Sequence, residues 1–230
     1  MTPADLLFSQ GFGTRRECAA LVAHGRLEVE GLGVVDDMDL ELGDGSGLWF
    51  RVGGGERWPW RERALIVLNK PAGYECSLKP RHHPSVYSLL PAPLRGRGVQ
   101  AIGRLDEDTT GVLLFTDDGT LVHRLTSPKR HVAKVYEVRC KHPVDSVQVD
   151  RLCAGVVLHD DDATVRAAAC EATGERALRL TLVEGKYHQV KRMVAAVGNR
   201  VEGLERSAFG AVRLDGLAPS RWRWLDPDAV

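Results

Sequence analysis

Continuous and alternating apolar runs divide the chain into predicted elements. Residues 64–68 and 112–115 are unbroken apolar stretches, which are typical of strands buried on both faces. Residues 178–182 alternate leucine with polar residues, which predicts a strand with one buried face. Residues 187–197 carry apolar side chains at helical spacing, which predicts an amphipathic helix with Tyr187 on its apolar face.

Capping signals predict two short helices at the start of the chain. Thr2 is a good N-cap for the first helix, and Thr14 with Glu17 forms a capping box for the second. Residues 26–31 then alternate like a strand that runs into a turn. Residues 43–63 are rich in glycine and predict a linker, because glycine triplets do not pack inside strands.

Residues 79–98 and 120–139 are predicted to contain a loop, a short helix and a strand. Residues 79–98 are rich in Pro, Gly and Arg without a clear period, and we expect a long loop there. Residues 120–126 predict a short helix. Residues 132–139 predict a strand with Lys134 and Tyr136 on one face.

Length and composition limit the classes of protein to consider. The chain has 230 residues, 43% of them hydrophobic and 27% charged, which suits one large or two smaller soluble domains. It has no apolar run of transmembrane length and no secretory signal, so we expect a cytoplasmic protein without a membrane partner. The five cysteines are scattered without a Cys-x-x-Cys motif, which favours reduced thiols over disulfides or zinc.

The charges are unevenly distributed although the net charge is zero. Residues 1–58 carry 5 basic and 10 acidic residues, whereas residues 59–230 carry 26 and 21. The basic excess concentrates at residues 123–142. A local basic patch is what contact with an RNA backbone requires, although a solvated charged face would have the same composition.

A polar loop leads into the buried strand at residues 112–115. Such loops are where a rigid scaffold presents chemistry, although composition alone also fits an acidic surface turn. Residues 106–110 also fit the Asp-x-Asp-x-Thr pattern of Mg²⁺-dependent haloacid-dehalogenase-type phosphatases, but there the first Asp directly follows a strand. Between Gly103 and Gly111 the loop contains Arg104, Asp106, Glu107 and Asp108.

The longest motif resembles one known family. Gly-Arg-Leu-Asp at residues 103–106, followed by Thr-Thr-Gly and by Leu-Leu-Phe-Thr-Asp-Asp-Gly up to Gly119, is similar to the catalytic motif of the RsuA/RluA-type pseudouridine synthases. Within that family the chain most resembles the RsuA type, which acts on small-subunit ribosomal RNA. Three further motifs agree, namely Lys-Pro-Ala-Gly at 70–73, Lys-Val-Tyr at 134–136 and Glu-Gly-Lys-Tyr-His-Gln-Val-Lys-Arg-Met at 184–193.

The resemblance implies an α+β fold with two domains. A small S4-like RNA-binding domain with a linker would occupy residues 1–58. Residues 59–230 would form the catalytic domain, a mixed, mostly antiparallel sheet flanked by helices. Because five acidic residues crowd positions 36–44, the first domain could instead only orient the second, or have no nucleic-acid role. Its phosphate contacts would be Arg15, Arg16 and Arg26.

The resemblance also assigns three catalytic residues. Asp106 would be the catalytic carboxylate, Tyr136 would lie under the target base, and Lys191 would pair with Asp106. A cation is useful there because burial alone favours the protonated carboxyl group. From the residues alone, the preferred interpretation of Tyr136 is an ordinary half-buried strand tyrosine. Whether Asp106 attacks the sugar, adds to the base or removes a ribose proton stays open.

Five residues are assigned to substrate binding by the same resemblance. Arg104 would fill the gap that a flipped uridine leaves, and Leu182 would pack near the uracil. Lys70, Lys134 and Arg192 would contact the RNA. Without the resemblance, Arg104 would be a partner of a neighbouring acid, and Lys70 could equally be a phosphate ligand or a turn lysine in solvent.

The predicted function is the isomerisation of a specific uridine to pseudouridine in small-subunit (16S) ribosomal RNA, free or in an assembly intermediate. We expect a monomer that needs no cofactor or metal. Two alternatives stay open: the same chemistry on large-subunit ribosomal RNA, as in the RluB, RluE and RluF enzymes, and a non-catalytic ribosome assembly factor.

Overall fold

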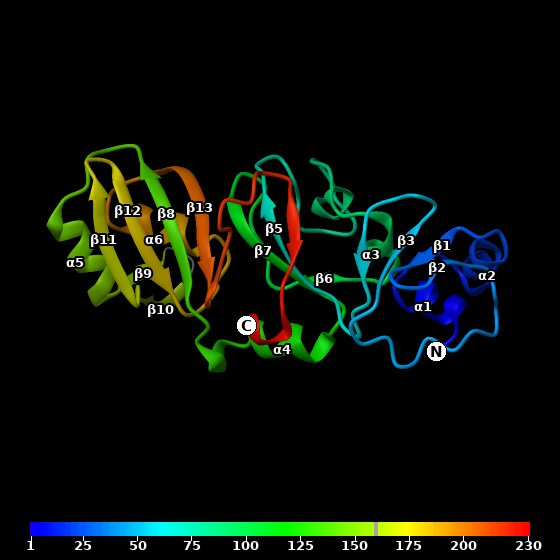
Figure 1. The fold of residues 1–230 in the computed structure, drawn as a ribbon. Helices are drawn as coiled ribbons and strands as arrows, with labels where there is room; N and C mark the ends of the chain where they lie inside the picture. Colours follow the sequence, from blue (N-terminus) through cyan, green and yellow to red (C-terminus); the bar gives the residue numbers. More distant parts are fainter. Residues whose placement is uncertain (159–160) are drawn as a thin grey trace. The chain divides into compact units, whose positions relative to one another are not determined.

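A computed structural model describes residues 1–158 and 161–230 of the chain. The chain forms two compact units (Figure 1). The first contains Met1–Ala64 and Leu90–Gln100, and the second contains Leu65–Leu89 and Ala101–Val230. Among the described residues, no helix is both long enough and apolar enough to cross a membrane.

Both N-terminal helices begin where the capping signals predict. In α1 (Pro3–Ser9) the side chain of Thr2 accepts a hydrogen bond from the backbone N–H of Asp5. In α2 (Arg15–Ala23) the side chains of Thr14 and Glu17 each accept a hydrogen bond from the other residue's backbone N–H, which is the complete capping box. The capping predictions are confirmed.

The first unit also contains a four-stranded sheet in the order β2-β1-β3-β4. Two of its strands fall within residues 43–63, so the prediction of a linker there was wrong. Phe50 is buried, and the ring of Phe12 packs edge-on against Phe50 and Trp58. These aromatic side chains hold the segment in the sheet, and the glycines form the turn between β3 and β4. The strands are β1 (Leu27–Val29), β2 (Gly33–Val35), β3 (Trp49–Val52) and β4 (Trp58–Pro59).

The prediction of one long loop at residues 79–98 was wrong. This segment contains the 3₁₀ turn η1 (Val86–Leu89) and the short helix α3 (Ala92–Gly96). Val86, Leu90 and Leu94 are buried. Elements of four and five residues are too short to show a clear hydrophobic period in the sequence.

The second unit is built on one large sheet, whose main strands follow the order β11-β12-β8-β13-β7-β5-β15. β13 and β7 are parallel, and the other neighbouring pairs in this order are antiparallel. The α+β class and the mixed, mostly antiparallel sheet are therefore confirmed. The strands are β5 (Leu65–Lys70), β7 (Thr110–Thr116), β8 (Lys134–Cys140), β11 (Ala169–Gly174), β12 (Ala177–Leu182), β13 (Val201–Phe209) and β15 (Trp222–Trp224), with β14 (Val212–Arg213) paired to β13.

Shorter elements complete the second unit. The strands β9 (Val156–Leu158) and β10 (Asp161–Val165) form a separate pair, and β6 (Gln100–Ala101) spans the boundary between the two units. The remaining elements are α4 (Gly119–Thr126), α5 (Ser146–Ala154), α6 (Gln189–Ala196), η2 (Pro128–Arg130) and η3 (Pro227–Ala229).

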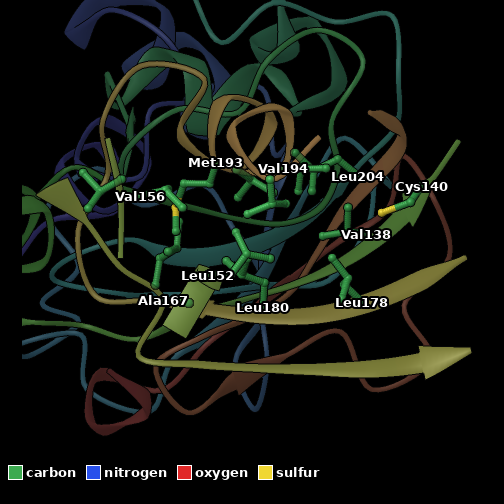
Figure 2. Close-up of a cluster of buried hydrophobic side chains, with 14 of the residues drawn as sticks. Val138, Cys140, Leu152, Val156, Ala167, Leu178, Leu180, Met193, Val194 and Leu204 are labelled. Atoms are coloured by element: carbon green, nitrogen blue, oxygen red, sulfur yellow. The ribbon is translucent and has the colours of Figure 1, made fainter. Parts of the chain in front are cut away.

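One hydrophobic core cluster of the second unit lies where α5 and α6 pack on the sheet. In Figure 2, Leu178 and Leu180 of β12 gather with Leu152 of α5 and with Met193 and Val194 of α6. These positions are the buried half of the leucine alternation and the apolar face of the helix, as the sequence predicts. The packing fixes α6 beside the ends of β8 and β12, where the polar loop before β7 also lies.

The helix predicted for residues 187–197 begins two residues later than expected. His188 has a left-handed backbone with φ 47°, and α6 starts at Gln189. Tyr187 therefore does not join the apolar face, and its side chain is 73% exposed.

Candidate active site

The loop of residues 103–109 carries Asp106 and leads into β7. This strand is buried along almost its whole length, as predicted. At the far end of this loop, Gly111 has φ 102° and pairs in register with Arg206 of β13. A Cβ atom at residue 111 would collide with the backbone carbonyl of Arg206. Glycine at this position thus allows the loop to enter the sheet against β13.

Lys70 holds the shape of this loop from within the protein. Its side chain is fully buried, and Nζ donates to the backbone carbonyls of Asp106 at 2.9 Å, Glu107 at 3.1 Å and Thr109 at 2.8 Å. A fourth carbonyl, that of Pro71, lies at 3.1 Å. The prediction that Lys70 contacts the RNA was wrong, because its ammonium group is enclosed and occupied by main-chain oxygens.

The carboxylate of Asp106 lies between two basic side chains from the loop and helix that follow β12. Its Oδ2 is 3.3 Å from Nζ of Lys191, and its Oδ1 is 3.3 Å from Nε2 of His188. The side chain of Asp106 is 25% exposed, so the carboxylate stays open to a substrate. The expected pairing of Asp106 with Lys191 is present in the geometry.

Lys191 makes a shorter contact with a second acid. Its Nζ donates to both carboxylate oxygens of Asp108, at 2.7 and 2.9 Å. Burial acts to lower the pKa of Lys191, but the hydrogen bond to Asp108 and the charges of Asp106 and Asp108 outweigh it, so this pKa is raised. Burial acts to raise the pKa of Asp108, but its hydrogen bond and ion pair with Lys191 lower it overall. One cation therefore serves two carboxylates.

A cavity of about 70 Å³ opens beside Asp106 and is lined by the predicted base-binding residues. Tyr136 of β8 and Leu182 of β12 contribute to its wall, and Leu182 is 1% exposed. Thr109 also lines it, and its buried hydroxyl has no hydrogen-bond partner within the described parts of the chain. The cavity thus joins a carboxylate, an aromatic ring and an aliphatic side chain from three separate segments.

Arg104 lines the same cavity and is exposed. In residues 1–158 and 161–230 it makes no hydrogen bond or ion pair with a neighbouring acid. Asp108, one of the partners considered for it, is engaged by Lys191 instead. Its guanidinium group is accordingly available to a ligand.

Two predicted RNA contacts lie apart from this cavity. Lys134 is half-buried and donates to the carbonyl of Val132 at 2.9 Å, and burial lowers its pKa, with the charge of Arg206 adding to the effect. Arg192 donates to the carbonyl of Tyr187 at 3.3 Å. Neither residue lines the cavity beside Asp106.

In the first unit, the three predicted phosphate contacts are all exposed. Arg15 is engaged within its own unit, because its guanidinium group binds Asp5 at 2.9 Å and lies 4.3 Å above the ring of Phe8. The side chain of Arg26 lies close to Gly53.

Sequence reasoning missed two members of the cluster around Asp106. His188 sits inside the motif at 184–193, but its contact with Asp106 depends on a left-handed turn that no periodicity reveals. Asp108 was seen as part of an acidic loop, without its partner Lys191. The phosphatase alternative fails on geometry, because Asp106 stands in a loop ahead of β7 rather than directly after a strand.

Comparisons with known proteins identify the family of the chain. Residues 64–196 match the family described as RNA pseudouridylate synthase. The ribosomal small subunit pseudouridine synthase A of Salmonella typhimurium is 45% identical over 166 residues, which are 72% of this chain and 71% of that protein. The corresponding protein of Escherichia coli K12 is 44% identical over the same shares.

Two further relatives span almost the whole chain. The uncharacterized RNA pseudouridine synthase YtzG of Bacillus subtilis is 38% identical over 98% of this chain and 95% of its own length. A crystal structure of a pseudouridylate synthase is 31% identical, covers 99% of this chain and 97% of that one, and has a TM-score of 0.69. The chain belongs to the RNA pseudouridylate synthase family, as an RsuA-type pseudouridine synthase.

Proposed function

We propose that this pseudouridine synthase acts on a uridine of small-subunit ribosomal RNA, with Asp106 as its catalytic carboxylate. The observation that carries the assignment of the residue is that Asp106, Tyr136 and Lys191, from three distant segments, line one cavity. The names of the relatives support the choice of RNA. We further propose that the enzyme works as a monomer in the cytoplasm, where ribosomes are assembled.

The reaction breaks the bond between ribose C1′ and uracil N1, rotates the base and joins C1′ to C5. A proton leaves C5 and N1 takes one up, so the product is an isomer of uridine. The target base must first leave its stack, which costs roughly a few kcal/mol. Asp106 then acts as an ionised nucleophile or base beside the ribose and the uracil. Lys191 supports the ionised form, because its ammonium group lies 3.3 Å from the carboxylate.

The other cavity residues bind the extruded base. Tyr136 offers its ring to the face of the uracil, and Leu182 supplies an apolar surface. Arg104, exposed beside the cavity, fills the space that the base leaves in the RNA, where its planar cation can stack and bind phosphate. In the first unit, Arg15, Arg16 and Arg26 supply phosphate contacts that orient the RNA.

The experiment is tritium release from RNA labelled at uridine C5, which detects the loss of the C5 proton. Asp106→Asn keeps the size of the side chain and removes its charge. We expect it to lower the rate of release on the order of 10⁴-fold, as loss of a nucleophile or base does. The exposed Asp150 on α5 gives the matched control Asp150→Asn, which should release tritium like the wild type.

Four substrates identify the target: small-subunit and large-subunit ribosomal RNA, each with and without ribosomal proteins. Release from small-subunit RNA alone supports the proposal. Release from large-subunit RNA alone would contradict the choice of subunit while keeping the chemistry. Binding of RNA without release from any substrate would instead point to an assembly factor.

A further inference from the structure

Tyr187 stands out at the edge of the site because most of its side chain is exposed. It lies between β12 and α6, and its side chain is 73% exposed. Its ring stacks on the imidazole of His188, with centroids 3.7 Å apart and planes inclined by 23°. A single exposed aromatic residue is common on proteins, so its meaning depends on what lies beside it.

Beside Tyr187 lies a second cavity of about 470 Å³. Its volume is within the range of small-ligand sites, which is roughly 300–1,000 Å³. Neither Tyr136 nor Leu182 lines it, whereas Asp106, Arg104 and Lys186 do. It therefore adjoins the cavity proposed for the uracil, with which it shares Arg104, Asp106 and Lys186. Its walls combine an exposed aromatic ring and the two cationic side chains with the carboxylates of Glu75, Asp106 and Glu107.

One carboxylate holds part of the wall of this cavity in place. Glu75 accepts hydrogen bonds from three successive backbone N–H groups, those of Arg81 at 3.0 Å, His82 at 2.8 Å and His83 at 2.9 Å. These bonds lower the pKa of Glu75 to about 2, so the carboxylate is charged at neutral pH. The segment that carries Glu75, Cys76 and Ser77 along the cavity is thus held in shape before any ligand arrives.

We propose that this second cavity is a subsite for the nucleotide next to the target uridine, whose base stacks on Tyr187. Arg104 and Lys186 face the phosphate of this nucleotide. The inference deepens the proposed function, because it takes RNA as the substrate. Stacking on an aromatic ring accepts every base, so the subsite selects an unpaired neighbour rather than a particular base. The target uridine is then recognised as part of a single-stranded step of at least two nucleotides.

A cycle that changes both the protein and the RNA tests this subsite. The ribosomal RNA fragment that releases tritium is bound to the enzyme, and its dissociation constant is measured by fluorescence anisotropy. Tyr187→Ala should weaken binding by roughly tenfold, the usual effect of removing one base–aromatic contact. Tyr187→Phe keeps the ring and should bind like the wild type. Val147→Ala, at another exposed apolar residue outside both cavities, is the matched control.

The second half of the cycle removes the partner base. Two RNAs carry an abasic nucleotide, one on the 5′ side and one on the 3′ side of the target. On one of them the loss caused by Tyr187→Ala should vanish, because the base that the ring would bind is already absent. An equal loss on both abasic RNAs, no loss on the intact RNA, or a loss with Tyr187→Phe would each overturn the subsite.

The proposed function and the subsite fail in different ways. If no ribosomal RNA releases tritium, the proposed function fails, and the same cycle is run on a pentauridylate with an abasic nucleotide on either side of its central uridine. Coupling between Tyr187 and one flanking base there would still support the subsite. If Tyr187→Ala and each abasic nucleotide instead weaken binding of that RNA independently, so that their effects add, the subsite is overturned.

Discussion

Two lysines serve the same seven-residue loop in opposite ways. Lys70 is fully buried and binds the loop through main-chain carbonyls. Lys191 is partly exposed and binds the loop through the carboxylates of Asp106 and Asp108. The first lysine determines the path of the loop backbone. The second lysine balances the charge of the carboxylate side chains that the loop carries. The site thus separates the residue that shapes the loop from the residue that makes the loop reactive.

The largest expected effect comes from replacing the buried lysine of this comparison, Lys70. Lys70→Met removes the ammonium group and leaves four carbonyls without their donor, which should cost about 3 kcal/mol of unfolding free energy. Lys134→Met is the matched control, because that lysine binds one carbonyl and is only half-buried. Urea unfolding followed by tryptophan fluorescence measures both. Equal losses in the two variants would show that the four carbonyls do not depend on Lys70.

The exposed half should respond in activity rather than in stability. Lys191→Met should lower tritium release by about 10²-fold, as the loss of one charged group beside a reacting carboxylate does. Its unfolding free energy should fall by less than about 1 kcal/mol, because the ion pair is open to solvent. Lys191→Arg keeps the charge and should recover part of the rate. A large loss of stability in Lys191→Met would contradict the division between the two lysines.

At alkaline pH the contributions of the two lysines to the unfolding free energy should change in opposite directions. Burial lowers the pKa of Lys70 below 10.5, against the opposing effect of nearby acids, so the unfolded chain binds this proton more tightly. The contribution of Lys70 to stability therefore rises with pH between its lowered pKa and 10.5. Since the pKa of Lys191 is raised, its contribution is full below 10.5 and is lost as the pH rises through its folded value.

Urea unfolding at a series of alkaline pH values measures this contrast. The difference between wild type and Lys70→Met should grow as the pH rises, whereas the difference between wild type and Lys191→Met should shrink above about pH 10.5. Groups common to both proteins cancel in each difference. Slopes of the same sign would contradict the assignment of opposite environments.

The smallest effect concerns Glu75, which anchors backbone as Lys70 does but with the opposite charge. Its pKa is lowered from 4.5 to about 2 by the N–H groups of His82, His83 and Arg81. Its contribution to stability is full above pH 4.5 and is lost as the pH falls from there to about 2. Glu75→Gln should remove this acid dependence, which hydrogen exchange of the three amides can follow. Unchanged exchange in the variant would contradict the anchoring role.

The sequence predicted the parts of the site that depend on local pattern. The apolar run before Thr116 identified β7, and the leucine alternation with the helix at Lys191 identified which elements meet in the core. The role of Lys70 escaped prediction because burial of a polar residue depends on tertiary packing rather than on neighbours in sequence. His188 escaped for a related reason, since one left-handed residue decided where α6 begins and where both Tyr187 and His188 point.

The positions of the two lysines in the chain, one before the loop and one far after it, have a consequence for the order of folding. Lys70 and the loop carbonyl of Asp106 are 36 residues apart, whereas Lys191 and Asp108 are 83 apart. β13 follows α6 in the chain, so the strand that completes the centre of the sheet is made after the lysine that pairs with the acids. Contacts over longer separations form later because their closure costs more entropy. We expect a nascent chain to shape its loop early and to hold two unpaired carboxylates until its last quarter is synthesised.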